Sequence, residues 1–536
     1  MPMPDGDGQI LFVNGTIRTM DPARPLAGGV LVHGGRIRFV GDGPETRRRA
    51  ATGVRTIDLG GRALLPGFID NHTHLVMGGH HLLGIDLRRC ASPKEFRDII
   101  GARVAQFPLR WVTGGTWDHE SWPVKKLPTC HLIDDVSAAT PVFVQRLDGH
   151  MGLANSLALR LAGISTATAD PRGGTIVRDP TTGEPTGILK DSAMDIVQAV
   201  IPKPPRAENE RAALSAMEEA RRHGITSVHD ITMEDDLELY LALDRERKLT
   251  LRIYARLPLA GYQRLVDQGI RAGSGTPFLR LGSLKAFADG SLGSNTAWFF
   301  DPYVNDPSST GLAMDALLSG EIRRCALEAD KNRLQLSIHA IGDRANHAVL
   351  TLFEEIEAVN PPWDRRFRIE HAQHVRPADI HRFRKLDVIV SAQPYHAIDD
   401  GCWAESRIGR ERLATTYAFR TFAGAGIHLC FGSDWTVAPL DPLSGISAAV
   451  TRCTLDGRNP QGWIPEQKLS VEEALRCYTA EGAYAAFEEG EKGSITPGKV
   501  ADLVVLDRDP LAVHENDLRS IEVDLTMVGG EVVYER

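Results

Sequence analysis

The sequence has few cysteines, and no two of them form a C-x-x-C motif. Seven cysteines are scattered among 536 residues, a pattern that favours neither a disulfide framework nor a thiolate zinc site. The chain also lacks an apolar run as long as the roughly 20 residues that cross a membrane, and its first residues show no basic segment followed by an apolar stretch. We therefore expect a cytoplasmic protein with reduced cysteines.

Basic residues are fewer than acidic ones. Lys and Arg number 61 against 70 Asp and Glu, so the net charge is −9, which opposes binding to nucleic acid or to an anionic membrane surface. Hydrophobic residues make up 42% of the chain and charged residues 24%, as is ordinary for a soluble globular protein. This composition favours a small molecule as the partner.

Both ends of the chain are rich in short apolar runs separated by tight turns. Turn segments such as NG, GG and GDG interrupt the first part, and the last part repeats this texture around a VGG turn. Strands as few as these are unstable separately but stable in a shared sheet. We predict that residues 1–63 and 490–536 form one composite β-sandwich domain.

Between these ends, eight apolar runs that resemble strands alternate with helical stretches. The runs occupy residues 64–70, 225–230, 249–257, 279–287, 334–340, 366–372, 388–394 and 427–435. Alternation of this kind predicts a parallel α/β fold, and eight strands close a TIM-type barrel. We predict a (β/α)8 barrel as the catalytic domain over residues 64–489.

The gap between the first two runs is far longer than a usual connection between a strand and a helix. It contains the segment GGTIVRDPTTGEPTGILK, whose turn residues between apolar positions predict a hairpin. We predict an insertion subdomain at residues 80–210 that lies over the barrel mouth.

Side chains that can bind a metal stand at the ends of five of the eight runs. The carboxyl ends of barrel strands converge on one site, and the H-x-H pair of the first run projects both imidazoles to the same side of a strand. Taken singly, each histidine could belong to the core and the aspartate could cap a helix, but six accidental matches are improbable together. The candidates are His72, His74, Lys285, His339, His371 and Asp434.

The motifs around these residues closely resemble those of a known family. They are similar to motifs of the amidohydrolase superfamily, in particular of the branch that contains YtcJ-like proteins and N-substituted formamide deformylases, amidohydrolase family 3. The motifs are LPGFIDNHTH, LKAFADGSLGS, SIHAIGDRA, IEHAQHV and FGSDW. The resemblance extends over nearly the whole chain, but it identifies the superfamily better than the substrate. Members are often dimers, so the resemblance allows a homodimer.

The resemblance implies a site for two divalent metal ions, for which we expect zinc. His72 and His74 would bind the more buried ion, and His339 and His371 would bind the second, each as a neutral imidazole held by a further hydrogen bond. Asp434 would bind the buried ion and act as the base for the attacking water.

Lys285 is the unusual member of the set, because an ammonium cannot ligate a metal. The resemblance implies that Lys285 is N6-carboxylated and so bridges the two ions as an anion. Burial and nearby cations would lower the pKa of the amine and supply the unprotonated form that must react. A structural Lys285 beside a single metal ion is the alternative.

Further residues are predicted to contact the substrate. His150, in DGHMGLANS, would be a second catalytic residue that hydrogen-bonds the substrate carbonyl, and His374 and His396 are expected at the barrel mouth. Tryptophans near the motifs indicate a pocket for an apolar or aromatic group, although core packing is their common use. The predicted substrate-binding residues are Trp117, Asp289, His374 and Trp435. Strand alternation predicts that Glu370, beside His371, points away from the metals and takes no part in catalysis.

The predicted activity is hydrolysis of a non-peptide carbon–nitrogen bond by a metal-activated hydroxide. The substrate would be a linear amide with an apolar or aromatic group, such as an N-substituted formamide or an aryl or acyl amide. Carbamate, cyclic amide and ester hydrolysis are the alternatives within the superfamily, whereas deamination is disfavoured because no glutamate stands beside His339. A non-catalytic metal-binding or ligand-binding barrel is the alternative of another class, but such a barrel would be expected to have lost a ligand.

Overall fold

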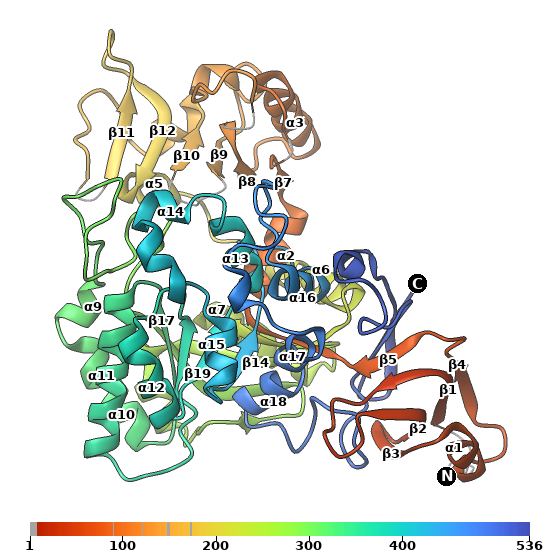
Figure 1. The fold of residues 1–536 in the computed structure, drawn as a ribbon. Coiled ribbons are helices and arrows are strands. Elements are labelled where there is room, and N and C mark those ends of the chain that lie inside the picture. The colour runs from red at the N-terminus through yellow and green to blue at the C-terminus, as the bar shows by residue number, and fades with distance from the viewer. Residues whose placement is uncertain (1–7, 89, 120–121, 147–150, 172–173) are drawn as a thin grey trace. The chain divides into compact units, whose positions relative to one another are not determined.

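The structure is a computed structural model that describes residues 8–88, 90–119, 122–146, 151–171 and 174–536 (Figure 1). Its contacts divide the chain into two compact units, one made of residues 1–75 and 217–536 and the other of residues 76–216. Within the described ranges, no helix has both the length and the apolar character needed to span a bilayer.

Eight strands form a nearly closed parallel barrel in the first unit (Figure 1). Every pair of neighbours in this barrel sheet is parallel, which confirms the predicted α/β barrel. In sheet order the strands are β20 (Leu429–Phe431), β19 (Ile389–Ala392), β18 (Arg368–His371), β17 (Gln335–Ala340), β16 (Leu279–Phe287), β14 (Arg252–Pro258), β13 (Ile225–Ile231) and β6 (Phe68–Thr73), and the short β15 (Ser274–Gly275) pairs with β16.

The barrel closes between its last strand, β20, and its first strand, β6. Asn71 Nδ2 donates to the Phe431 carbonyl at 2.9 Å, and the His74 N–H donates to the Trp435 carbonyl at 3.0 Å. A parallel bridge joins Thr73 to Trp435. The closure therefore lies at the carboxyl ends of these two strands.

The apolar run 64–70 does not form the single strand that its sequence predicts. Its first residues belong to β5 (Ala63–Pro66), which pairs with β21 (Leu503–Leu506), and β6 begins only at Phe68. Between them lies Gly67, where a Cβ would stand 2.2 Å from the side chain of Thr226. The prediction of one strand was wrong because both short strands are fully buried, so burial left no break in the apolar pattern.

Strands from both ends of the chain share one sheet, and in Figure 1 the red N-terminal strands lie beside the blue C-terminal segment. The Ile37 N–H donates to the Lys499 carbonyl at 2.8 Å, which joins the β3 edge to the segment before β21. Phe12, Val30, Leu503 and Met527 are buried in a common core. In addition to β5 and β21, the sheet contains β1 (Gln9–Arg18), β2 (Leu26–His33), β3 (Arg36–Gly41), β4 (Arg55–Asp58), β22 (Val523–Val528) and β23 (Glu531–Glu535), and α1 (Gly43–Arg49) follows β3.

Helices between the strands pack against the barrel, and α10, α11 and α12 lie side by side (Figure 1). In α11 the buried residues Val349, Phe353 and Ile356 recur at helical spacing, so one face meets the strands. The helices are α7 (Glu234–Arg245), α8 (Tyr262–Asp267), α9 (Asp315–Leu318), α10 (Glu321–Lys331), α11 (Asp343–Val359), α12 (Pro377–Lys385), α13 (Pro394–Asp400), α14 (Ala404–Ile408), α15 (Phe419–Gly424), α16 (Pro442–Thr451), α17 (Val471–Cys477) and α18 (Ala480–Ala485).

The second unit contains a six-stranded sheet in the order β11-β12-β10-β9-β8-β7. Phe96, Trp117, Trp122 and Val144 are buried in its core, and β11 and β12 pair antiparallel, which confirms the predicted hairpin. Its strands are β7 (Ile85–Asp86), β8 (Val112–Trp117), β9 (Val142–Arg146), β10 (Met151–Ala154), β11 (Gly174–Arg178) and β12 (Pro185–Asp191). Its helices are α3 (Pro93–Gln106), α4 (Ser156–Leu161) and α5 (Ser192–Gln198), while α2 (Leu75–Leu83) and α6 (Arg206–Arg222) begin and end the segment.

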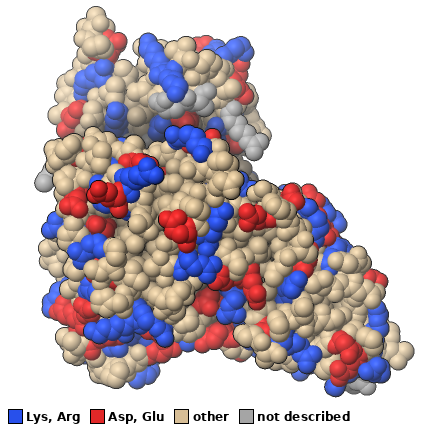
Figure 2. Space-filling model, viewed as in Figure 1, with Lys and Arg blue, Asp and Glu red and all other residues tan. Residues whose placement is uncertain are grey.

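Charged side chains of both signs are interspersed over the face shown in Figure 2. In the interior of the first unit, charges occur in partnered sets. Arg252 on β14, for example, lies 2.6 Å from Asp502, beside β21, and both side chains are almost fully buried. This ion pair joins the barrel to the terminal sheet.

Candidate metal centre

Strand β6 and the turn after β20 bring His72, His74 and Asp434 together. Asp434 Oδ1 lies 3.5 Å from His72 Nε2 and 3.3 Å from His74 Nε2, and the candidate ligand atoms all lie within 4.8 Å of one another. The Asp434 backbone is left-handed, with φ of 57°, and its N–H donates to the His72 carbonyl at 2.7 Å. This backbone conformation is unfavourable for a residue with a Cβ, and the hydrogen bond to β6 holds it.

Glu370 holds the ring of His72. Its Oε2 lies 2.5 Å from His72 Nδ1, and its Oε1 lies 2.8 Å from Arg256 and 3.0 Å from Arg368. Burial by itself would raise the pKa of Glu370, but the two guanidinium groups and His72 outweigh burial and hold the pKa well below its usual range. The ionised carboxylate therefore accepts a hydrogen bond from the Nδ1–H group of His72, which leaves His72 Nε2 free to bind a metal.

The prediction that Glu370 points away from the metal residues was wrong. Alternation assumes a regular strand, but β18 ends in residues with left-handed backbone, His371 with φ of 74° and Ala372 with φ of 44°. The two neighbours Glu370 and His371 can therefore both reach the residues at the carboxyl ends of the strands.

His339 and His371 stand together at the ends of β17 and β18. Their ring centroids are 4.5 Å apart, and the centroids of His371 and His72 are 4.9 Å apart. His339 Nε2 lies 3.0 Å from the Gly290 carbonyl, and His371 Nδ1 lies 2.7 Å from Gln393 Oε1. Because an oxygen acceptor fixes the proton on the facing nitrogen, the other nitrogen of each ring is left free to bind a metal.

Burial keeps these imidazoles neutral, which is the form that binds metals. Burial, and then the charge of Lys285, lowers the pKa of His72 to about 3 and that of His339 to about 4. Burial and the neighbouring His339 hold the pKa of His371 well below its usual value. For Asp434, burial by itself would raise the pKa, but its contacts with His72 and His74, which include a hydrogen bond from His74, hold that pKa well below its usual range.

Lys285 on β16 is buried, and its Nζ has no hydrogen-bond partner among the described residues. Burial lowers the pKa of this amine to about 7, against the attraction of Glu370. A polar group buried without a partner is costly unless something else satisfies it. A lysine in this state fits the carboxylated bridge that the family resemblance implies.

A second set of candidate ligand atoms shares Asp434. The ligand atoms of His371, His396 and Asp434 also lie within 4.8 Å of one another. Sequence reasoning had placed His396 at the barrel mouth, among the candidates for contact with the substrate. Asp434 is thus common to two clusters of nitrogen and oxygen donors, which is the composition of a site for zinc or a similar divalent ion.

The residues predicted to bind the substrate are mostly buried and partnered. Asp289 accepts hydrogen bonds from the N–H groups of Ile341, at 3.0 Å, and Gly342, at 2.8 Å, so it fixes the loop after β16. His374 Nδ1 lies 2.9 Å from Thr416 Oγ1, and Trp435 is 6% exposed. Their contact with a substrate stays a prediction.

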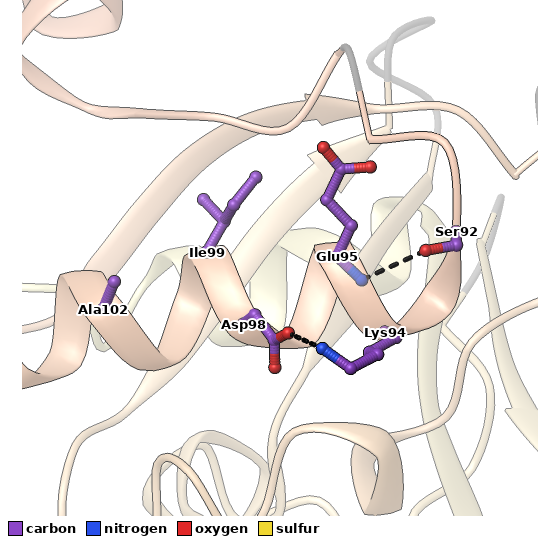
Figure 3. Close-up of a pocket in the computed structure, with 6 residues that line it drawn as sticks. All are labelled: Ser92, Lys94, Glu95, Asp98, Ile99 and Ala102. Carbon is purple, nitrogen blue, oxygen red and sulfur yellow. Dashed lines mark hydrogen bonds and ion pairs between the residues drawn. The ribbon is translucent and has the colours of Figure 1, made fainter.

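Trp117 lies in the core of the second unit, where its indole N–H donates to the Val144 carbonyl at 2.9 Å. His150 falls outside the described residues. The second unit also carries a shallow hollow of about 480 Å³ along α3 (Figure 3). This hollow is lined by Ser92, which caps the helix, and by the Lys94–Asp98 ion pair, so its polar groups already have structural partners.

Sequence reasoning missed the residues that orient the histidines. Arg256 and Gln393 are buried in the barrel, and a charged residue within an apolar run, such as Arg256 in LRIYARLP, was the one available signal. Nothing in the sequence indicated that its partner would be Glu370.

Comparison with known proteins agrees with this geometry. Residues 55–534 match the Amidohydrolase family. LONG AFTER FAR-RED 3 of Arabidopsis thaliana is 37% identical over 98% of this chain and 91% of its own length. The YtcJ protein of Bacillus subtilis is 31% identical over 98% and 99% of the two chains, and the N-substituted formamide deformylase of Arthrobacter pascens is 29% identical over 98% of each.

Among solved structures, an uncharacterized metal-dependent hydrolase from Pyrococcus furiosus superposes with a TM-score of 0.78. The two sequences are 30% identical, and the alignment covers 94% of this chain and 100% of the other. The barrel and the terminal sheet therefore have a close counterpart in a solved structure.

Proposed function

This chain belongs to the Amidohydrolase family and is a hydrolase acting on carbon–nitrogen bonds other than peptide bonds, and we propose that it cleaves a small linear amide with the help of two divalent ions. The observation that carries this proposal is the cluster of His72, His74 and Asp434, with the rings of His371 and His339 directly beside it. Two adjacent groups of metal-binding side chains are expected where two ions are bound close together.

In the proposed site, His72 and His74 would hold one ion, and His339 and His371 would hold the other. Asp434 would bind the first ion, and a Lys285 carboxylated on Nζ would bridge both. Zinc is the ion that this mixture of imidazole and carboxylate suits. When bound, divalent ions of this kind lower the pKa of water to about 7 and polarise a carbonyl group.

The side chains of the site have distinct tasks in the proposed reaction. Asp434 accepts a proton from the attacking water and delivers it to the nitrogen that leaves. Glu370 and Gln393 hold the rings of His72 and His371 in the tautomers that leave one nitrogen free. The carbon–nitrogen bond breaks, and the products are a carboxylic acid and an amine.

An exposed aromatic ring beside the site supports a substrate with an apolar or aromatic group. Phe287, at the end of β16, is 44% exposed, although large apolar side chains are usually buried. Its ring centroid lies 4.7 Å from Lys285 Nζ and 5.3 Å from the ring of His339. We infer that the substrate covers Phe287, and the name of the deformylase relative favours N-substituted formamides as the first compounds to test.

The test is a panel of compounds that share one benzyl group: N-benzylformamide, N-benzylacetamide, benzyl carbamate and benzyl acetate. Release of benzylamine or benzyl alcohol is measured for the zinc-loaded protein, with and without chelator. Chelator-sensitive cleavage of an amide supports the proposal. Cleavage of the carbamate or the ester alone would replace the substrate class, and turnover that survives full removal of metal would refute the role of the ions.

A further inference from the structure

His396 lies at the site but has no place in the proposed ligand set. It belongs to the first turn of α13, which begins directly after β19. Its ring is parallel to that of His371, with 11° between the planes and 6.4 Å between the centroids. The same turn begins with Gln393, which binds His371 Nδ1. One short segment therefore sets the positions of both imidazoles.

The Nε2 atom of His396 is buried and has no hydrogen-bond partner among the residues that the structure describes. Buried polar atoms in folded proteins are almost always partnered. A neutral imidazole carries a proton on one of its two nitrogens, so the buried Nε2 can act as a donor. A neutral imidazole beside the reaction centre can donate one hydrogen bond without adding a charge.

A substrate bound at the metal residues would offer this nitrogen a partner. A candidate ligand nitrogen of His396 lies within 4.8 Å of the ligand atoms of both His371 and Asp434, so a group held between the metal residues and α13 comes within its reach. The atom of an amide that needs a donor there is the carbonyl oxygen, because negative charge develops on that oxygen as water adds to the carbon.

We propose that His396 is a further catalytic residue, which donates an Nε2–H hydrogen bond to the carbonyl oxygen of the substrate. This inference rests on the proposed function, because it takes the scissile group to be a carbonyl at this site. The bond strengthens as the oxygen becomes negative, so His396 acts mainly on the turnover number. His396 thus takes the role that sequence reasoning had assigned to His150, which is to hydrogen-bond the substrate carbonyl.

The alternative is that His396 is itself a metal ligand. The proposed set already provides two imidazoles for each ion, with Lys285 shared between the ions and Asp434 on the first. A third imidazole on the second ion would occupy a position that a catalytic zinc site keeps open for the substrate. The two roles differ in what happens to bound metal when the imidazole is removed.

The experiment compares wild-type protein with His396→Ala, His396→Asn and the control His381→Ala, whose side chain is exposed on α12. Three quantities are measured for each zinc-loaded protein: zinc content, kcat and KM for the amide that wild type cleaves, and the Kd of methylphosphonate by calorimetry. Methylphosphonate carries tetrahedral anionic oxygens, and its binding is measured whether or not the protein turns over an amide. Its affinity therefore tests His396 even if the proposed substrate class fails.

We expect His396→Ala to keep its zinc, to lose about 10²-fold to 10³-fold in kcat with little change in KM, and to bind methylphosphonate at least about 10-fold more weakly. His396→Asn, which retains a donor group, should recover part of both losses, and the control should match wild type. Loss of one zinc ion from both His396 variants would identify a ligand and overturn the proposal. An unchanged methylphosphonate Kd, or a change confined to KM, would also overturn it, and if His396→Ala does not fold, the Asn variant decides the matter alone.

Discussion

Glu370 on β18 contacts His72 on β6 across the barrel interior, with 2.5 Å between Oε2 and Nδ1. The two strands are not neighbours in the sheet, so this contact ties one candidate metal ligand to a distant strand of the barrel. Arg256 on β14 and Arg368 on β18 bind the same carboxylate. A single buried carboxylate thus connects the stability of the barrel to the orientation of a ligand.

Replacement of Glu370 by Gln should damage both properties. Two guanidinium groups would lose their buried counter-charge, and breaking such a partnership typically costs about 3–5 kcal/mol of unfolding free energy. The affinity for metal should fall about 10-fold to 100-fold, because His72 loses its acceptor. Denaturant unfolding and chelator competition measure the two effects. Glu218→Gln, in an exposed pair with Arg222, is the matched control, and equal behaviour of the two variants would contradict this account of Glu370.

Removal of metal should abolish turnover. Protein purified from zinc-supplemented medium should contain between about one and two ions per chain, and dialysis against a chelator should inactivate it reversibly. Readdition of zinc should restore activity in proportion to the metal that is bound. A metal content near zero after reconstitution would exclude the proposed mechanism.

Replacement of Asp434 by Asn should separate metal binding from catalysis. The amide keeps an oxygen that can ligate, while the four histidines remain, so most of the metal should stay bound. The loss of the base should lower kcat by about 10²-fold to 10⁴-fold. Metal analysis and steady-state kinetics on one preparation check both expectations, and unchanged turnover would remove Asp434 from the role of base.

Replacement of Lys285 by Ala should lower activity by at least about 100-fold and leave a cavity beside the histidines. If a carboxylated lysine bridges the ions, acetate or propionate should enter this cavity and restore part of the activity. Rescue is measured as a function of acid concentration. Lys331→Ala, at the end of α10, should show neither loss nor rescue, and a Lys285 variant that no acid rescues would leave the carboxylated form unsupported.

Replacement of Phe287 by Ala should change substrate preference. Removal of the ring takes an apolar contact from the substrate, and we expect kcat/KM for N-benzylformamide to fall about 10-fold while that for N-methylformamide changes little. Val304, which is 57% exposed, provides the control variant Val304→Ala. An equal loss on both formamides would show that Phe287 supports the site without contacting the aromatic group.

The sequence predicted the fold more completely than the site, for a physical reason. Barrel strands are apolar because both of their faces are buried, and this pattern marked all eight. It failed at residues 64–70, where a second sheet begins without any break in burial. At the site, regular alternation misplaced Glu370, because the left-handed backbone of His371 depends on the tertiary environment rather than on the residue type.

The sequence by itself determined the family, the barrel and the set of candidate ligands. The family follows from the resemblance of the motifs, whereas the barrel and the candidate ligands follow from the apolar runs and the residue types at their ends. Only the tertiary structure decided which nitrogen of each imidazole stays free, since the acceptors Glu370, Gln393 and the Gly290 carbonyl come from other strands and loops. Only it revealed that a ring nitrogen of His396 lies close to His371 and Asp434, and that its Nε2 has no hydrogen-bond partner among the described residues. Such a position depends on contacts between segments that are distant in the chain.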